Sequence, residues 1–231
     1  MTSPTLPPEL LDRLRSFDTA TVSNAIEHFK LRDQTTGYTN NEIKCHFPNI
    51  QPMVGYAITC TGDTSCPNDS RSSNVDKLVE VIEAAPKPSV IVVQHTGHDR
   101  SRSCFIGDIF SSVTSKLGAV GFVTDANVRD VAGIATRTPE YQVFSAGTVA
   151  SHGWGVFFDF NIEVTVAGLT IAPGDLLHGD ANGLISVPFD SAEVIADRAV
   201  DVIAAEKEMF AFLAGDDFTI DELKKRFVPH D

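Results

Sequence analysis

The chain has 231 residues, of which 42% are hydrophobic and 21% are charged, an ordinary balance for a folded globular protein. Its formal net charge of −13 argues against a nucleic-acid partner, because phosphate binding needs clustered basic side chains and the Lys-Lys-Arg run at 224–226 is short and lies beside acidic residues. No apolar run is long enough to span a membrane, and the N-terminus lacks the basic start and apolar core of a signal peptide, so we expect a cytoplasmic protein without membrane contact.

The first half of the chain alternates helical and extended patterns. Pro7-Pro8 ahead of apolar residues at helical spacing predicts a helix start. Asp18 or Thr19 predicts the cap of a second helix that ends near Phe29. The following segments predict a loop over 31–52, a strand over 53–60, a polar loop over 61–73 and a helix over 74–85.

The second half begins with a β-α-β pattern and ends in helices. An apolar run at 89–94 predicts a buried strand. After it the sequence predicts a polar loop over 95–103, a helix over about 108–117, and strands over 119–124 and 141–145. The remainder predicts a β-rich stretch from 160 to 188 and helices over about 191–214 and 219–227. No repeat or linker interrupts the chain, so we expect one α/β domain over residues 1–231 with helices at both ends.

Two carboxylates and a guanidinium stand close to predicted turns between residues 107 and 130. Asp108 follows Gly107 at a predicted helix start, and twenty residues separate it from the Arg129-Asp130 pair. Carboxylate oxygens suit hard divalent cations such as Mg²⁺ or Mn²⁺, and arginine suits a carboxylate or a developing enolate oxygen. The N-terminus of the helix adds unpaired N–H groups that can receive an anion. The pattern therefore predicts a site for a divalent cation and a small α-keto acid.

This D-x20-R-D pattern resembles the RraA-like family, which includes the 4-hydroxy-4-methyl-2-oxoglutarate aldolases and oxaloacetate decarboxylases. The resemblance covers about residues 10–215 and implies a single domain of the swivelling β/β/α type, assembled as a homotrimer or a hexamer with sites between subunits. Further matching segments are Val131-Ala132, Pro173-Gly174-Asp175, Asp180, Gly183, Pro188 and the N-terminal run from Asp18 to Ser23.

The resemblance also implies roles for individual residues. Asp130 would bind Mg²⁺ or Mn²⁺ directly, and Asp108 would bind it through a water molecule. Arg129 would contact the substrate and stabilise enolate charge. The backbone around Gly107, with the amides of Ile109, Phe110 and Ser111, would receive the substrate carboxylate. A glutamate from the C-terminal helix of a neighbouring subunit completes the family's site, and Glu206 matches it better than Glu208.

Each of these residues also has a structural interpretation. Asp108 could simply cap a helix, and Arg129 with Asp130 could be a surface ion pair. Glu206 could be a solvent-facing charge on an amphipathic helix. One departure from the family is Ala126, where glycine is usual, and alanine there requires a negative φ angle.

Other chemistries have weaker signals. A zinc cluster would need His95, His98, Cys60, Cys66 and Cys104, but their spacing is irregular and contains no paired motif. A Schiff base has no lysine within the motif except Lys116 on the predicted helix. The glycines at 118–121 lack a nucleotide-binding fingerprint. His98 lies in the loop before Asp108 and is expected to shape the substrate pocket.

Three functions follow from the sequence. The first is a class II, metal-dependent lyase that breaks a C–C bond of an α-keto acid through a pyruvate enolate, with both aldolase and decarboxylase activity. The second is a non-catalytic protein-binding regulator, as the ribonuclease-inhibiting members of the family are. Those members lack the full D-x20-R-D set, so its presence here favours the enzyme. The third is a hydrolase or hydratase that reuses the same metal site.

Overall fold

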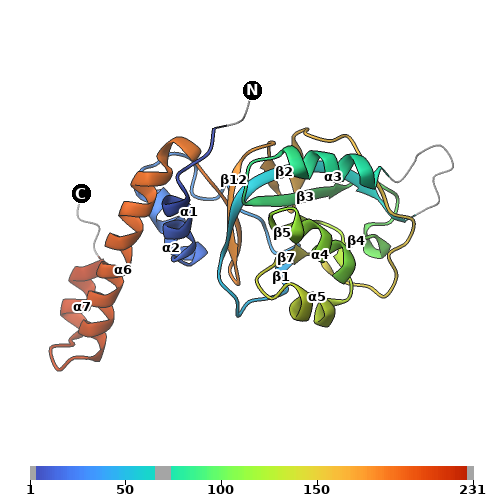
Figure 1. Cartoon of the computed structure of the whole chain (residues 1–231). Helices are drawn as coiled ribbons and strands as arrows, with labels where there is room; N and C mark the ends of the chain where they lie inside the picture. Colours follow the sequence, from blue (N-terminus) through green and yellow to red (C-terminus); the bar gives the residue numbers. More distant parts are fainter. Residues whose placement is uncertain (1–3, 66–73, 228–231) are drawn as a thin grey trace.

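The chain is built around an eight-stranded sheet whose middle strands are parallel (Figure 1). The computed structural model describes residues 4–65 and 74–227. The strand order is β1-β7-β5-β3-β2-β12-β13, and β9 pairs with β2. The bounds are β1 Lys44–Cys45, β2 Met53–Asp63, β3 Ser89–His95, β5 Ala119–Thr124, β7 Gln142–Ser145, β9 Val156–Phe158, β12 Leu176–Asp180 and β13 Gly183–Val187.

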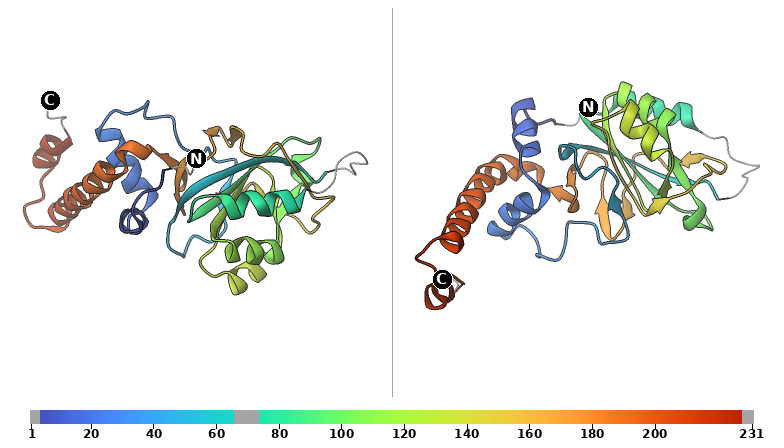
Figure 2. Two further views of the ribbon diagram at one scale, coloured as in Figure 1. Left: turned by 45° about the horizontal axis from the view of Figure 1, so that its top comes forward. Right: turned by 90° about the horizontal axis from the view of Figure 1, so that it is seen from below.

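The sheet is covered on both faces, so its central strands β2, β3 and β5 are buried along almost their whole length. All eleven residues of β2 are buried. One face packs against α3 (Val75–Ala84), α4 (Asp108–Lys116) and α5 (Val131–Arg137), which lie together on that side (Figure 2). The other face packs against a hairpin of β10 (Val164–Val166) and β11 (Leu169–Ile171).

The helices from the two ends of the chain pack on each other at the β12–β13 end of the sheet (Figure 1). They are α1 (Pro8–Arg15), α2 (Thr19–His28) and α6 (Ala192–Ala214), and a short 3-10 helix, η2 (Phe189–Ser191), leads into α6. The far part of α6 extends away from the sheet and carries α7 (Ile220–Phe227), whose Arg226 guanidinium lies 4.2 Å from the Phe212 ring centroid. This group of helices is therefore remote from α4 and α5.

A small second sheet lies beside α4 and α5. It consists of three short parallel strands, β4 (Cys104–Ile106), β6 (Asn127–Val128) and β8 (Gly147–Thr148). A short 3-10 helix, η1 (Arg100–Arg102), precedes β4 in the chain. The sequence patterns predicted neither these strands nor α5 and β9. They did predict the main helices and strands, and the α/β fold class is confirmed. Asp18 is the cap of α2, since its Oδ1 accepts the Thr21 N–H at 2.6 Å.

Candidate active site

The small sheet explains the spacing of twenty residues between Asp108 and Arg129. The chain leaves β4, runs through α4 and β5, and returns as β6 alongside β4. Ile106 pairs with Val128, and the Arg129 N–H donates to the Ile106 carbonyl at 3.0 Å. Because the two strands are parallel, the residues that follow them leave at the same edge. Asp108 and the Arg129-Asp130 pair are therefore brought together by backbone pairing.

These residues share one cavity of about 270 Å³. The described part of its wall contains every residue of the predicted site in this chain except Ser111 and Glu206. It also contains residues outside the predicted site, among them His152 and Phe157. The full lining is Thr64, Val75, Cys104, Phe105, Ile106, Gly107, Asp108, Ile109, Phe110, Arg129, Asp130, His152, Gly155 and Phe157.

The N-terminus of α4 forms part of the cavity wall. Asp108 is the first helical residue and Gly107 is the N-cap, so the interpretation of Asp108 as a side-chain cap is wrong. The Ser111 N–H donates to the Gly107 carbonyl at 2.9 Å, and Ser111 is fully buried. That amide is therefore already paired. The amides of Ile109 and Phe110 belong to the first turn, where no intrahelical carbonyl is available to them, and they remain the candidates for anion binding.

Asp108 is held by an arginine that the sequence analysis missed. The Arg137 Nε atom lies 3.1 Å from Asp108 Oδ2, and the Asp108 side chain is only 20% exposed. A Cβ atom at Gly133 would lie 2.8 Å from the same carboxylate oxygen, so glycine at this point leaves room for the Asp108 side chain. The only clue in the sequence is helical spacing: Gly133 and Arg137 are four residues apart and so share one face of α5.

Arg129 and Asp130 form the ion pair expected of neighbouring charges, with Nε 3.2 Å from Oδ2. Asp130 is 37% exposed and has a φ angle of 55°, a left-handed conformation that aspartate tolerates better than most residues. A Cβ atom at Gly107 would lie 2.7 Å from Asp130 Oδ2, which explains the glycine before Asp108. Ala126 does not have a positive φ, so its departure from glycine leaves the turn intact.

The donor set fits a hard cation with few protein ligands. Within residues 4–65 and 74–227, no three His, Cys, Asp or Glu side chains are grouped to hold a metal, and Cys66 lies outside these ranges. Mg²⁺ keeps several waters and takes only one or two carboxylates, so Asp130 would suffice as a direct ligand and Asp108 would contact one of the waters. Burial raises the pKa of the Cys104 thiol on the same wall, which keeps that group protonated and unsuited to bind a cation.

Three other residues singled out in the sequence lie outside this cavity. Lys116 is at the far end of α4. His98 is exposed on the loop before η1 and is absent from the cavity wall, so the prediction that it shapes this pocket is wrong within one chain. Glu206 is exposed on α6, remote from α4 and α5 (Figure 1), so it could only reach the site of another copy.

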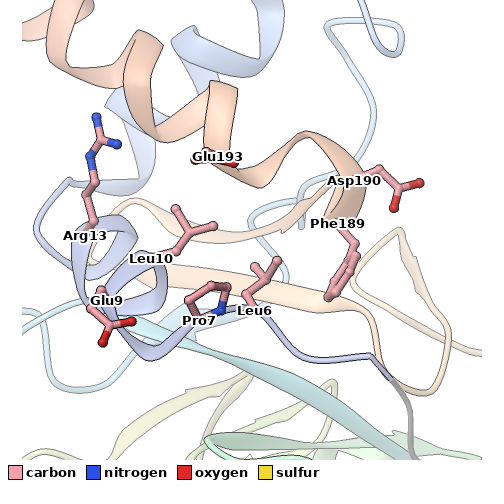
Figure 3. A pocket seen from close by; sticks show the side chains of 8 residues that line it. All are labelled: Leu6, Pro7, Glu9, Leu10, Arg13, Phe189, Asp190 and Glu193. Atoms are coloured by element: carbon pink, nitrogen blue, oxygen red, sulfur yellow. The ribbon is translucent and has the colours of Figure 1, made fainter.

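A larger cavity of about 470 Å³ lies between α1, η2 and the start of α6 (Figure 3). Its wall combines apolar side chains with the acidic residues Glu9, Asp190 and Glu193. Its one arginine, Arg13, is already paired with Asp197 at 2.6 Å. Among its described residues this wall offers no unpaired basic side chain for an anionic substrate, so we place the candidate active site in the smaller cavity.

Comparison with known proteins connects this geometry to one family. The model of the RraA-like family, described as Aldolase/RraA, matches residues 19–186. A protein of Halalkalibacterium halodurans named "Putative 4-hydroxy-4-methyl-2-oxoglutarate aldolase" is 33% identical over 54% of this chain and 58% of its own length. Protein DlpA of Legionella pneumophila is 26% identical over 64% of this chain. The match spans only 24% of that protein, so both relatives extend well beyond the matched segment.

Solved structures share the fold. An uncharacterized protein from Pseudomonas syringae superposes with a TM-score of 0.74 and 23% identity, over 98% of each chain. RraAS2 of Streptomyces coelicolor, described as an unusual member of the RNase ES inhibitor RraA protein family, gives a TM-score of 0.66 with 22% identity, over 89% of this chain and 98% of its own. At these identities the likeness concerns the fold alone. Among the described residues, no helix has the length and apolar character needed to cross a membrane.

Proposed function

Because this chain belongs to the RraA-like family, we propose that it is a divalent-metal-dependent carbon–carbon lyase acting on a small α-keto acid. The proposed reaction passes through a pyruvate enolate, as in 4-hydroxy-4-methyl-2-oxoglutarate cleavage and in oxaloacetate decarboxylation. One observation carries the proposal: Arg129 and Asp130 share a cavity with Asp108 and the first turn of α4. That wall offers the Arg129 guanidinium and two free backbone amides to a small anion. It also offers two carboxylates to a divalent cation.

The groups on the wall divide the proposed work. The amides of Ile109 and Phe110 would receive the substrate carboxylate, aided by the positive end of the helix dipole. The Arg129 guanidinium would neutralise the charge that grows on the enolate oxygen. Asp130 would hold Mg²⁺ or Mn²⁺, and Asp108 would accept a hydrogen bond from a water of that ion. When bound, the cation supplies Lewis acidity at the keto and carboxylate oxygens.

We further propose that the protein works as a homotrimer or a hexamer. Glu206 lies on the part of α6 that extends away from the sheet, where its side chain is exposed. Apolar side chains on the same part of the chain are also exposed, including Ile203, Phe210 and Leu213. Packing of α6 on another copy would bury these groups and could bring Glu206 to that copy's cavity.

The test is pyruvate release from oxaloacetate and from 4-hydroxy-4-methyl-2-oxoglutarate, followed by coupled oxidation of NADH, with Mg²⁺ and then with EDTA. Turnover that EDTA abolishes supports the lyase and ranks the two substrates. Metal binding without release of pyruvate from either substrate would overturn the lyase in favour of a hydrolase or hydratase at the same site. Absence of both metal binding and turnover would favour the protein-binding regulator.

A further inference from the structure

The described part of the cavity wall carries one imidazole, which the proposed roles leave unused. His152 lies on the loop after β8 and lines the cavity with Asp108, Arg129 and Asp130. Its Nδ1 atom lies 2.8 Å from the carbonyl oxygen of Gly153. A carbonyl oxygen only accepts hydrogen bonds, so Nδ1 must carry the proton. In the neutral ring, Nε2 is then left with a free lone pair.

The loop that carries His152 is fixed to the small sheet. The Trp154 N–H donates to the Thr64 carbonyl at 3.0 Å, and the Thr64 hydroxyl accepts the Cys104 N–H of β4 at 2.8 Å. Gly153 has a φ angle of 60°, and a Cβ atom there would lie 2.0 Å from the Thr64 carbonyl oxygen. Contacts to the β4 wall therefore set the position of the residue next to His152.

The other titratable groups on this wall are engaged. Asp108 is paired with Arg137, and Asp130 is paired with Arg129 and is assigned to the cation. Burial raises the pKa of the Cys104 thiol, which keeps it protonated. Among the described lining residues, His152 is the nitrogen base that forms no ion pair.

We propose that His152 Nε2 is the proton acceptor of the aldol reaction. This inference rests on the proposed lyase function. Nε2 takes the proton of the C4 hydroxyl as the C4–O bond becomes a carbonyl and the C3–C4 bond breaks. The electron pair of that bond forms the pyruvate enolate, whose carbon then takes a proton from water. The His152 imidazolium returns its proton to water, so no net proton is consumed.

The two substrates make different demands on such a base. An aldol substrate must lose a hydroxyl proton before its C–C bond can break. Oxaloacetate loses CO₂ from a carboxylate and has no hydroxyl proton to give up at this step. His152 should therefore matter for one reaction and not for the other, whereas a residue that merely maintains the shape of the site would affect both.

The test compares His152→Gln and His152→Ala with the wild type on both substrates. We expect kcat for 4-hydroxy-4-methyl-2-oxoglutarate cleavage to fall about 100-fold while oxaloacetate decarboxylation stays within about threefold, the size expected for loss of a general base. Added imidazole should restore aldol cleavage in H152A, where it fills the vacated space, and not in H152Q. The matched control is His98→Gln, an exposed histidine outside the cavity.

Each outcome has a distinct meaning. Suppose that the wild type is active on both substrates. If H152Q then lowers both reactions equally, or lowers neither, the role of His152 is overturned and the lyase function stands. A wild type inactive on both substrates would overturn the proposed function and this inference with it. Unfolding temperatures and pyruvate binding, compared between wild type and variants, separate a lost base from a disturbed fold.

Discussion

Asp108 and Arg137 form an ion pair across the two helices that flank the candidate active site, with Arg137 Nε 3.1 Å from Asp108 Oδ2. Asp108 opens α4 and Arg137 closes α5, so the pair ties the start of one helix to the end of the next. The carboxylate has two oxygens, and this contact uses one of them. The other can still face the cavity in a fixed orientation.

Replacing Arg137 should weaken catalysis without abolishing it. In Arg137→Gln the Asp108 carboxylate loses its charged partner and gains rotational freedom, so we expect kcat to fall about tenfold, as is usual when a partner of a metal-site group is removed. Arg137→Lys keeps the charge and should retain more activity than the glutamine variant. Steady-state kinetics with pyruvate detection would check both. Equal activity in R137Q and the wild type would refute the positioning role.

Gly133→Ala separates the demands of the site from those of the fold. Alanine in place of glycine inside a helix is worth about 0.5–1 kcal/mol of stability, so α5 alone would favour the change. The added methyl would lie 2.8 Å from Asp108 Oδ2, however, and the carboxylate would have to move. We expect a variant that unfolds at or above the wild-type temperature and has lost most of its activity.

Gly147→Ala is the matched control, because a Cβ atom there would meet only Asn127 Oδ1, at 3.3 Å. Thermal unfolding and turnover of both variants would be measured side by side. Full activity in G133A would mean that Asp108 can shift without consequence, and its proposed role would have to be withdrawn.

Asp130→Asn should remove the cation while keeping the backbone. Asparagine tolerates the left-handed conformation of Asp130 as well as aspartate does, so the turn into α5 should survive. We expect affinity for Mn²⁺ to fall by more than about 100-fold, the upper value seen when a mere neighbour of a metal ligand is lost. Titration of Mn²⁺ by electron paramagnetic resonance would report binding directly, with Asp216→Asn as an exposed control. Unchanged Mn²⁺ affinity in D130N would assign the cation to other ligands.

The sequence could predict the centre of this site because its chemistry lies in a short and distinctive pattern. Gly107, Asp108, Arg129 and Asp130 all meet in one cavity, as the pattern and the family resemblance implied. The helix that starts at Asp108 was also predicted, and α4 begins at that residue and runs for nine residues to Lys116.

The surroundings of the site could not be predicted in the same way. The strands β4, β6 and β8 are two or three residues long, too short for an alternating pattern to emerge. They nevertheless decide which loops meet at the cavity. Arg137 belongs to a seven-residue helix containing a glycine, and His152 to a loop without periodicity. Their roles depend on packing between segments far apart in the chain, and no local pattern encodes it.

The buried histidine His178 should make folding sensitive to mild acid. Burial lowers the pKa of its imidazole below the ordinary value of 6.5. The neutral ring is fully paired: Nε2 donates to the Leu14 carbonyl at 3.1 Å, and Nδ1 lies 3.0 Å from the Thr19 hydroxyl, which can donate to it. A proton on Nδ1 would turn that acceptor into a second donor and place a charge in the core between α1, α2 and β12.

The sign of the effect follows from proton linkage. Below about pH 6.5 the unfolded chain takes up a proton that the folded chain refuses, so the free energy of unfolding falls as pH falls. Burial also lowers the pKa of His46, which adds to the trend. Each histidine can contribute at most about 1.4 kcal/mol per pH unit. Urea unfolding between pH 7.5 and 5.5 would measure how steeply the free energy of unfolding depends on pH. His46→Asn and His178→Asn should each make this dependence weaker. His98→Gln, at an exposed position, should leave it unchanged. A free energy of unfolding that stays constant over this range would contradict the assignment of a neutral buried ring at His178.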